Sequence, residues 1–180
     1  MLERLRGRLV VSCQPVAGGP MDRPDIVAAL ALAALAGGAA GVRIEGVANL
    51  RAVRAATAAP VIGLVKRDLD GWDVRITPLV EDVDALAEAG ADIVAVDATR
   101  RRRPVAVGGL LTRVRARGRL AMADCATLDD AREARAMGFD LLGSTLSGYT
   151  GGPVPEGPDL ALVAALRRLG GFVMAEGRYN

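Results

Sequence analysis

The sequence predicts a single α/β domain of the TIM (β/α)₈-barrel type over residues 1–180. Apolar strand-like segments alternate with helix-like segments, as is typical of a parallel sheet. Each apolar segment becomes polar or charged at its C-terminal end, where such barrels keep their chemistry. The chain is 51% hydrophobic but only 3% aromatic and holds 22 glycines. Small apolar side chains must therefore fill the core.

The chain is short for this fold. It has 180 residues, whereas a complete barrel typically needs roughly 250. Only seven strand-like segments can be counted, so we expect an incomplete barrel that lacks the C-terminal eighth βα unit. Such a barrel would expose the edges of its first and seventh strands.

The first half of the chain holds three strand–helix pairs. A Gly-Gly pair ends the first helix, and Pro and Gly residues after the first strand mark a turn. Residues 72–76 alternate between apolar and polar side chains, which favours a hairpin or edge strand that extends a loop. The expected strands are residues 9–14, 41–45 and 60–66, and the expected helices are residues 26–36, 47–57 and 80–89.

The second half repeats this pattern and ends on a seventh strand. Thr127 is the expected N-cap of one helix, because two acidic residues follow in its first turn. A long Gly- and Pro-rich loop precedes the last helix. The expected strands are residues 92–97, 120–124, 139–145 and 171–176, and the expected helices are residues 109–117, 128–137 and 159–169.

Charge and cysteine usage narrow the class of protein. The formal net charge is +2, so no broad polyanion-binding surface is indicated and nucleic acid is not an expected partner. No segment resembles a signal peptide or a membrane span. Cys13 and Cys125 lie in strand-like segments without CxxC spacing, which favours reduced, buried thiols in a cytoplasmic protein.

The chain contains no histidine. This excludes imidazole general bases, Ser-His-Asp triads and His-ligated metals. Acid–base chemistry must then fall to Lys, Asp, Glu, Tyr or Cys, and the first three of these occur at strand ends.

The polar residues at the strand ends should meet at one mouth of the barrel. Lys66 is the only lysine in the chain. A partly desolvated lysine can act as a base, which arginine cannot. The alternative role for Lys66 is a structural salt bridge to Glu45 or Asp68. The full set at the mouth is Gln14, Arg43, Glu45, Lys66, Asp97, Asp124 and Glu176.

Other charged and glycine-rich segments are open to two interpretations. Glu176 can be catalytic or can pair with Arg43 or Arg178. The run at residues 100–103 is expected to send one arginine inward and the others into solvent. The glycine-rich loop at residues 148–152 could cradle phosphate, although Gly177-Arg178 is better placed for this, since barrels bind phosphate after strands seven and eight.

Eight sequence blocks, in order along the chain, resemble the bacterial N-acetylmannosamine-6-phosphate 2-epimerase family. The blocks are Val11-Ser12-Cys13-Gln14, Gly41-Val42-Arg43-Ile44-Glu45-Gly46, Val61-Ile62-Gly63 with Lys66-Arg67-Asp68, Ile76-Thr77-Pro78, Asp97-Ala98-Thr99 with Arg103-Pro104, Met122-Ala123-Asp124, Ser144-Thr145-Leu146-Ser147-Gly148-Tyr149-Thr150 and Ala175-Glu176-Gly177-Arg178.

The resemblance implies an isomerase that interconverts N-acetylmannosamine 6-phosphate and N-acetylglucosamine 6-phosphate at C2, in the catabolism of sialic acid and amino sugars. It implies Lys66 and Glu176 as catalytic residues and no cofactor or metal. It also implies that Gln14, Arg43 and Asp124 bind the sugar, that Gly177 and Arg178 bind the phosphate, and that the protein forms a homodimer.

Family members continue beyond the Ala-Glu-Gly-Arg block, so the resemblance implies a chain truncated after the seventh strand. Two alternatives remain at this point. The chain could be an inactive remnant or a non-catalytic fragment, or it could be another phosphosugar isomerase barrel.

Overall fold

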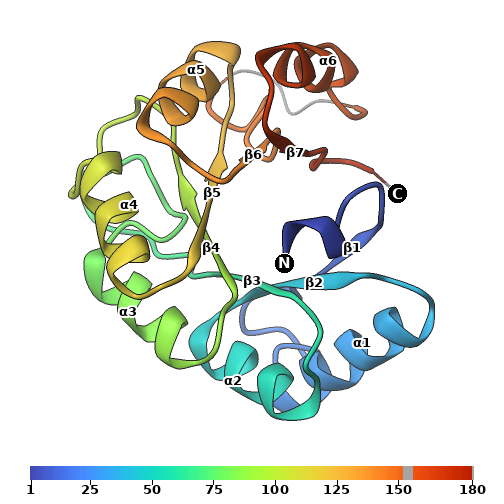
Figure 1. Cartoon of the computed structure of the whole chain (residues 1–180). Helices are drawn as coiled ribbons and strands as arrows, with labels where there is room; N and C mark the ends of the chain where they lie inside the picture. The colour runs from blue at the N-terminus through green and yellow to red at the C-terminus, as the bar shows by residue number, and fades with distance from the viewer. Residues whose placement is uncertain (152–155, 180) are drawn as a thin grey trace.

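The computed structural model describes residues 1–151 and 156–179. Its centre is one sheet of seven parallel strands in the order β1-β2-β3-β4-β5-β6-β7, which confirms the predicted fold class. The strands curve around an interior, with the helices outside them (Figure 1). The strands are β1 Val10–Cys13, β2 Gly41–Glu45, β3 Val61–Leu64, β4 Ile93–Asp97, β5 Leu120–Asp124, β6 Leu141–Gly143 and β7 Phe172–Met174.

Six α-helices and one short 3₁₀ segment are described. The α-helices are α1 Pro24–Ala36, α2 Val47–Ala56, α3 Val80–Glu88, α4 Val107–Ala116, α5 Leu128–Met137 and α6 Leu160–Leu169, and the 3₁₀ segment is η1 Leu2–Arg4. None of the described helices combines the length and the hydrophobicity that crossing a bilayer requires.

Capping explains where two of these helices begin. The Thr127 hydroxyl accepts a hydrogen bond from the Asp130 N–H at 3.1 Å, which confirms the predicted N-cap of α5. The Asp159 carboxylate caps α6 in the same way, since it accepts from the Leu162 N–H at 2.8 Å. Gly138 ends α5 in the left-handed region, with φ of +93°.

Several predicted strands are longer than the observed ones; residues 139–145, for example, shorten to β6 Leu141–Gly143. Residues 72–76 form no strand; one antiparallel bridge joins Lys66 to Ile76 and folds this loop back onto the end of β3. Strand β7 pairs only with β6, over three residues, and ends at Met174. The predicted strand 171–176 was therefore too long, and residues 176–178 lie in the loop after β7.

The apolar residues form two layers, one on each face of the sheet. Strand β4 shows the alternation clearly, because Ile93 and Ala95 face the barrel interior whereas Val94 and Val96 face the helices. The N-terminal segment closes the interior at the start of the strands. Leu5 is buried in the inner layer, and the Arg6 guanidinium lies 5.4 Å from the centroid of the Phe172 ring.

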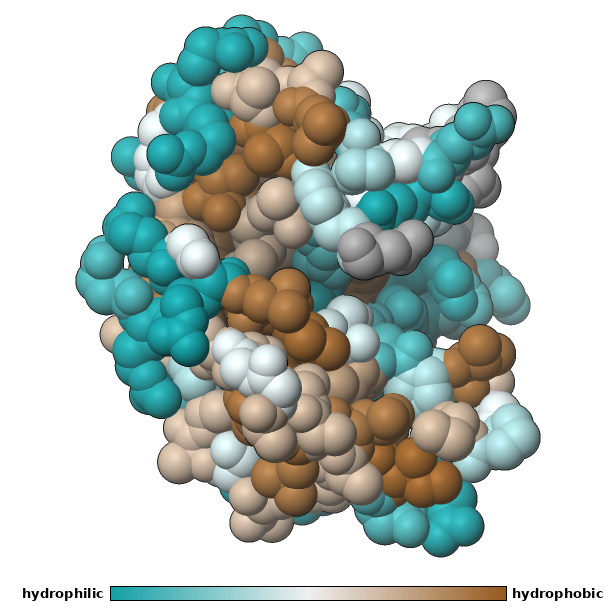
Figure 2. All heavy atoms as spheres, turned by 90° about the vertical axis from the view of Figure 1, so that its right-hand side faces the viewer, coloured by the Kyte–Doolittle hydropathy of each residue, from teal (hydrophilic) through white to brown (hydrophobic). Residues whose placement is uncertain are grey.

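The wall is open between β1 and β7, which do not pair with each other in the described residues. Figure 1 shows both chain ends near this opening, and Figure 2 looks at it directly. Apolar surface flanks the opening in Figure 2. The exposed large apolar residues of helices α1 and α6 are Leu30, Leu32 and Leu160. The sheet thus has a closed wall, β2 to β6, and two margins, β1 and β7.

Candidate active site

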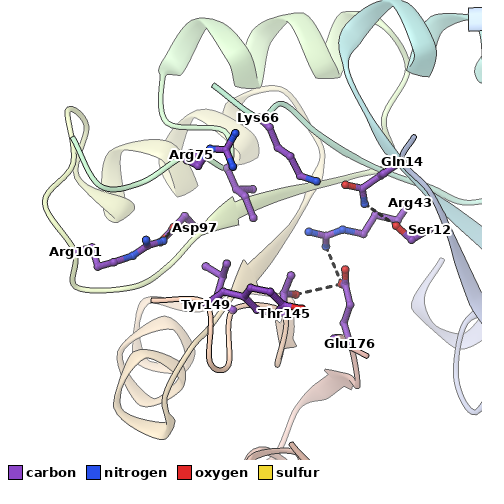
Figure 3. Close-up of a pocket in the computed structure, with 13 residues that line it drawn as sticks. Ser12, Gln14, Arg43, Lys66, Arg75, Asp97, Arg101, Thr145, Tyr149 and Glu176 are labelled. Atoms are coloured by element: carbon purple, nitrogen blue, oxygen red, sulfur yellow. Dashed lines mark hydrogen bonds and ion pairs between the residues drawn. The ribbon is translucent and has the colours of Figure 1, made fainter. Parts of the chain in front are cut away.

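A cavity of about 510 Å³ lies at the C-terminal ends of the strands. This volume is within the range of small-molecule sites. Figure 3 shows that side chains from both margins and from the closed wall point into it. The lining residues are Ser12, Gln14, Arg43, Lys66, Arg75, Ile76, Asp97, Arg101, Thr145, Leu146, Tyr149, Glu176 and Gly177.

Arg43 of β2 supplies a fixed positive charge at the base of this cavity. Its Nη2 and Nη1 lie 2.7 and 3.2 Å from the two carboxylate oxygens of Asp124, and Nη1 lies 3.1 Å from Glu176 Oε2. Burial opposes the charge, but the two carboxylates outweigh it and raise the pKa of Arg43. Arg43 is therefore held as a cation that cannot titrate.

Asp124, at the end of β5, lies behind Arg43 rather than on the cavity surface. Its side chain is fully buried, and it accepts hydrogen bonds from Arg43 and from the Thr145 hydroxyl. The residue was predicted to bind the sugar. Its geometry instead suits the positioning of Arg43.

Lys66 lies two residues beyond β3 with its side chain at the cavity mouth. Partial loss of solvent lowers the pKa of its ammonium group; Arg43 and Arg75 add to this, and Glu45 and Glu176 oppose it. Among residues 1–151 and 156–179, Lys66 makes no ion pair, and Asp68 pairs with Arg75 instead. The alternative of a structural salt bridge is therefore wrong.

Glu176 follows β7, and the backbone around it is tightly held. The Ser144 hydroxyl accepts from the Glu176 N–H at 3.0 Å and donates to the Glu176 carbonyl at 2.7 Å. Burial and the Asp124 carboxylate raise the pKa of Glu176, against the opposing charges of Arg43 and Lys66. The pairing with Arg43 is confirmed, whereas Arg178 turns away to another partner.

The remaining predicted residues divide into two groups. Gln14 and Gly177 line the cavity, and the Gln14 amide donates to Ser12 Oγ at 2.7 Å. Arg178 lies outside the lining, where its Nε donates to the Tyr149 hydroxyl at 3.1 Å. Gly177 has φ of +101°, a conformation that favours glycine. In the glycine-rich loop at 148–152, residue 152 lies outside the described residues.

The arginine run differs from the prediction of one inward side chain. Both Arg101 and Arg103 turn to Asp97, at 2.6 and 3.0 Å. Arg100 pairs with Glu133 on the surface, and only Arg101 of the run lines the cavity. The buried Asp97 carboxylate also accepts from the Thr99 N–H and hydroxyl, so each of its two oxygens has a hydrogen-bond partner.

Three polar cavity residues, Ser12, Arg75 and Thr145, were missed from the sequence, as were the apolar Ile76 and Leu146; Tyr149 lies in the glycine-rich loop that was considered for phosphate. Thr145 had a usable signal, since it is the second polar residue after an apolar strand. Arg75 had none, because only the fold-back of its loop brings it to the mouth.

Within the described ranges, no group of three or more His, Cys, Asp or Glu residues is arranged to hold a metal ion. Cys13 and Cys125 are both free and buried, as predicted.

Comparisons with known proteins agree on one family. A family model described as "Putative N-acetylmannosamine-6-phosphate epimerase" matches residues 27–180. A Haemophilus ducreyi protein named as a putative N-acetylmannosamine-6-phosphate 2-epimerase is 59% identical over 180 residues, covering 100% of this chain and 79% of that protein. The bifunctional enzyme NanE/NanK of Brucella melitensis is 59% identical over 181 residues, covering 100% of this chain and 35% of that protein.

A solved structure of the N-acetylmannosamine-6-phosphate 2-epimerase from Clostridium perfringens superposes with a TM-score of 0.96 at 38% identity. The superposition covers 100% of this chain and 80% of the Clostridium perfringens chain. A dipeptide epimerase from Enterococcus faecalis, with a TM-score of 0.56 at 18% identity, shares the fold alone.

Proposed function

Because this chain belongs to the N-acetylmannosamine-6-phosphate epimerase family, we propose that it interconverts N-acetylmannosamine 6-phosphate and N-acetylglucosamine 6-phosphate. The reaction inverts C2, the carbon that bears the N-acetyl group. Residues 1–180 act as one catalytic domain. The alternative of another phosphosugar barrel has no support in the comparisons.

One observation carries the proposal: the amine of Lys66 and the carboxyl of Glu176 point into the same cavity from different sides (Figure 3). Their pKa values are shifted toward each other, down for Lys66 and up for Glu176. Inversion without oxidation needs one group to remove a proton from C2 and another to deliver one to the opposite face. Two groups with pKa values tuned toward neutrality suit this task.

The reaction begins from the open-chain sugar, whose C1 carbonyl makes the hydrogen on C2 acidic. Removal of that proton gives an enolate-like intermediate with negative charge on oxygen. Lys66 acts on one face of C2 and Glu176 on the other, and reversal of their roles gives the reverse reaction. The Arg43 guanidinium, fixed by Asp124, stabilises the charge that develops on the substrate oxygens.

The same cavity offers groups for the rest of the substrate. Gln14 adds a hydrogen bond to the sugar. The loop after β7 begins the phosphate site, where the backbone of Gly177 approaches closely and Arg178 supplies charge. The Tyr149 contact would keep Arg178 near the mouth.

Lys66 provides the direct test. We expect the Lys66→Arg and Lys66→Ala variants each to lose at least about 100-fold in kcat, because a general base typically contributes that much. Lys66→Arg keeps the charge but cannot titrate. Arg102→Ala is the matched control, since Arg102 stacks on Trp72 and does not line the cavity. Near-normal turnover by Lys66→Arg would exclude Lys66 as a base.

We also propose a homodimer, supported by the exposed apolar face of α1. We propose that the chain does not bind nucleic acid, because its net charge is close to neutral. A phosphorylated sugar substrate and two free cysteines favour the cytoplasm.

A further inference from the structure

The Thr145 hydroxyl lies between two carboxyl groups. Its Oγ1 is 2.7 Å from Asp124 Oδ1 and 3.2 Å from Glu176 Oε2. A hydroxyl has one proton, so it can donate to only one of the two. The other oxygen must face a lone pair of Thr145, which an ionised carboxylate would not favour and a protonated carboxylic acid would.

The contact lengths assign the proton to Asp124. The Asp124 carboxylate is fully buried, and its two oxygens are paired with both terminal nitrogens of Arg43. A separation of 2.7 Å is typical of a hydroxyl donating to a carboxylate, whereas 3.2 Å is long for such a bond.

We propose that Thr145 is a positioning residue for Glu176: its hydroxyl gives its one proton to Asp124 and accepts the proton of the Glu176 carboxylic acid. This inference rests on the proposed function, in which Glu176 must alternate between two protonation states. Arg43 holds Glu176 Oε2 when the group is ionised, and Thr145 holds the same oxygen when it is protonated. Glu176 thus stays in place in both states.

The end of β6 is shaped to admit this contact. A Cβ atom at Gly143 would lie 2.9 Å from Thr145 Oγ1 and 3.4 Å from Asp124 Oδ1. Any side chain at Gly143 would therefore displace both the Met122 methyl group, 2.5 Å from the same Cβ position, and the Thr145 hydroxyl.

The Thr145 hydroxyl can either donate to Glu176 or accept from it, and the two directions shift the pKa of Glu176 with opposite signs. The charged groups facing Glu176 are Arg43 from β2, Lys66 from the end of β3 and Asp124 from β5. If the Thr145 hydroxyl donated to Glu176, it would lower the pKa of that carboxyl. If it donates to Asp124 and accepts from Glu176, as the contact lengths favour, it raises the pKa of Glu176.

The test is a carboxyl-carbon NMR titration of the full chain, with the Glu176 signal assigned by its loss in Glu176→Gln. We expect Thr145→Val and Thr145→Ala to lower the pKa of Glu176, and Thr145→Ser to leave it near the wild-type value. Thr112→Val is the matched control, because Thr112 bonds only to its own helix. A raised or unchanged pKa in both hydroxyl-free variants would overturn the proposal.

Activity gives a second readout. We expect Thr145→Val to lose about tenfold or more in kcat with little change in KM, and Thr145→Ser to restore most of it. Full activity in Thr145→Val would contradict a positioning role. The titration requires no turnover, so an inactive wild-type chain would count against the proposed function without deciding the assignment of the Thr145 proton.

Discussion

The closed wall and the two margins of this sheet contribute differently to the cavity. Nearly all side chains of β2 to β6 are buried, whereas every residue of β7 is partly exposed and only Cys13 of β1 is buried. The closed wall carries the buried charges Arg43, Asp97 and Asp124. The margins lead into Gln14, Glu176 and Gly177, which face the substrate space.

The difference teaches how the site divides its work. Charges that must stay fixed are placed where strands pair on both sides and solvent is excluded. Arg43 is such a fixed charge even though it is expected to touch the substrate, whereas Gln14 and Glu176 follow strands with one partner, where local opening costs less free energy. Lys66 belongs to the second group despite its strand, because it lies beyond the end of β3 in an exposed position.

Breaking the fixed pair in the closed wall should have the largest effect on stability. We expect Asp124→Ala to lower the free energy of unfolding by about 3–5 kcal/mol, because it leaves the buried Arg43 guanidinium with one carboxylate less. Urea unfolding followed by circular dichroism measures this. If the free energy of unfolding fell by less than ~1 kcal/mol, the value of a surface ion pair, the proposed contrast between the closed wall and the margins would be contradicted.

Two methionines of the inner layer allow a matched comparison. Met122 lies in β5 and is completely buried, whereas Met174 lies in β7 and is partly exposed. We expect Met122→Ala to cost about 2–5 kcal/mol. Met174→Ala should cost about half as much or less, because folding removes less of the apolar surface of Met174 from contact with water. Equal losses in parallel urea titrations would show that the margin is as well packed as the wall.

The smallest effect concerns pH. The pKa of Glu176 is raised above its ordinary 4.5 in the folded chain, so the folded state binds its proton more tightly than the unfolded state. The stabilising contribution of Glu176 is therefore fully present below pH 4.5 and is lost as pH rises through the folded pKa. The stability of the wild type relative to Glu176→Gln, measured at a series of pH values, should fall across that window. A rise would contradict the assignment.

The sequence was sufficient to predict the fold and most of the cavity, because the evidence for both is local. Apolar runs ending in polar residues located β2 to β6, and parallel strands bring such ends together. Arg43, Lys66 and Asp97 were placed at the cavity for this reason, and Gln14, Glu176 and Gly177 because they follow the first and seventh apolar runs.

What could not be predicted depends on three-dimensional pairing. In the sequence, Asp124 cannot be distinguished from any other polar residue at the end of a strand. Only the structure shows that its buried carboxylate pairs with Arg43. The two arginines on Asp97 and the fold-back that carries Arg75 follow from loop paths, which have no periodic signal.

The central claim is that Lys66 and Glu176 exchange the C2 hydrogen through opposite faces of the sugar. Epimerisation in deuterated water, followed by NMR of C2, tests it most directly. The account predicts that the wild-type product carries deuterium at C2 and that neither Lys66→Ala nor Glu176→Gln interconverts the two sugars. Retention of the original hydrogen at C2 in the wild-type product, or interconversion by either variant at the wild-type rate, would contradict it.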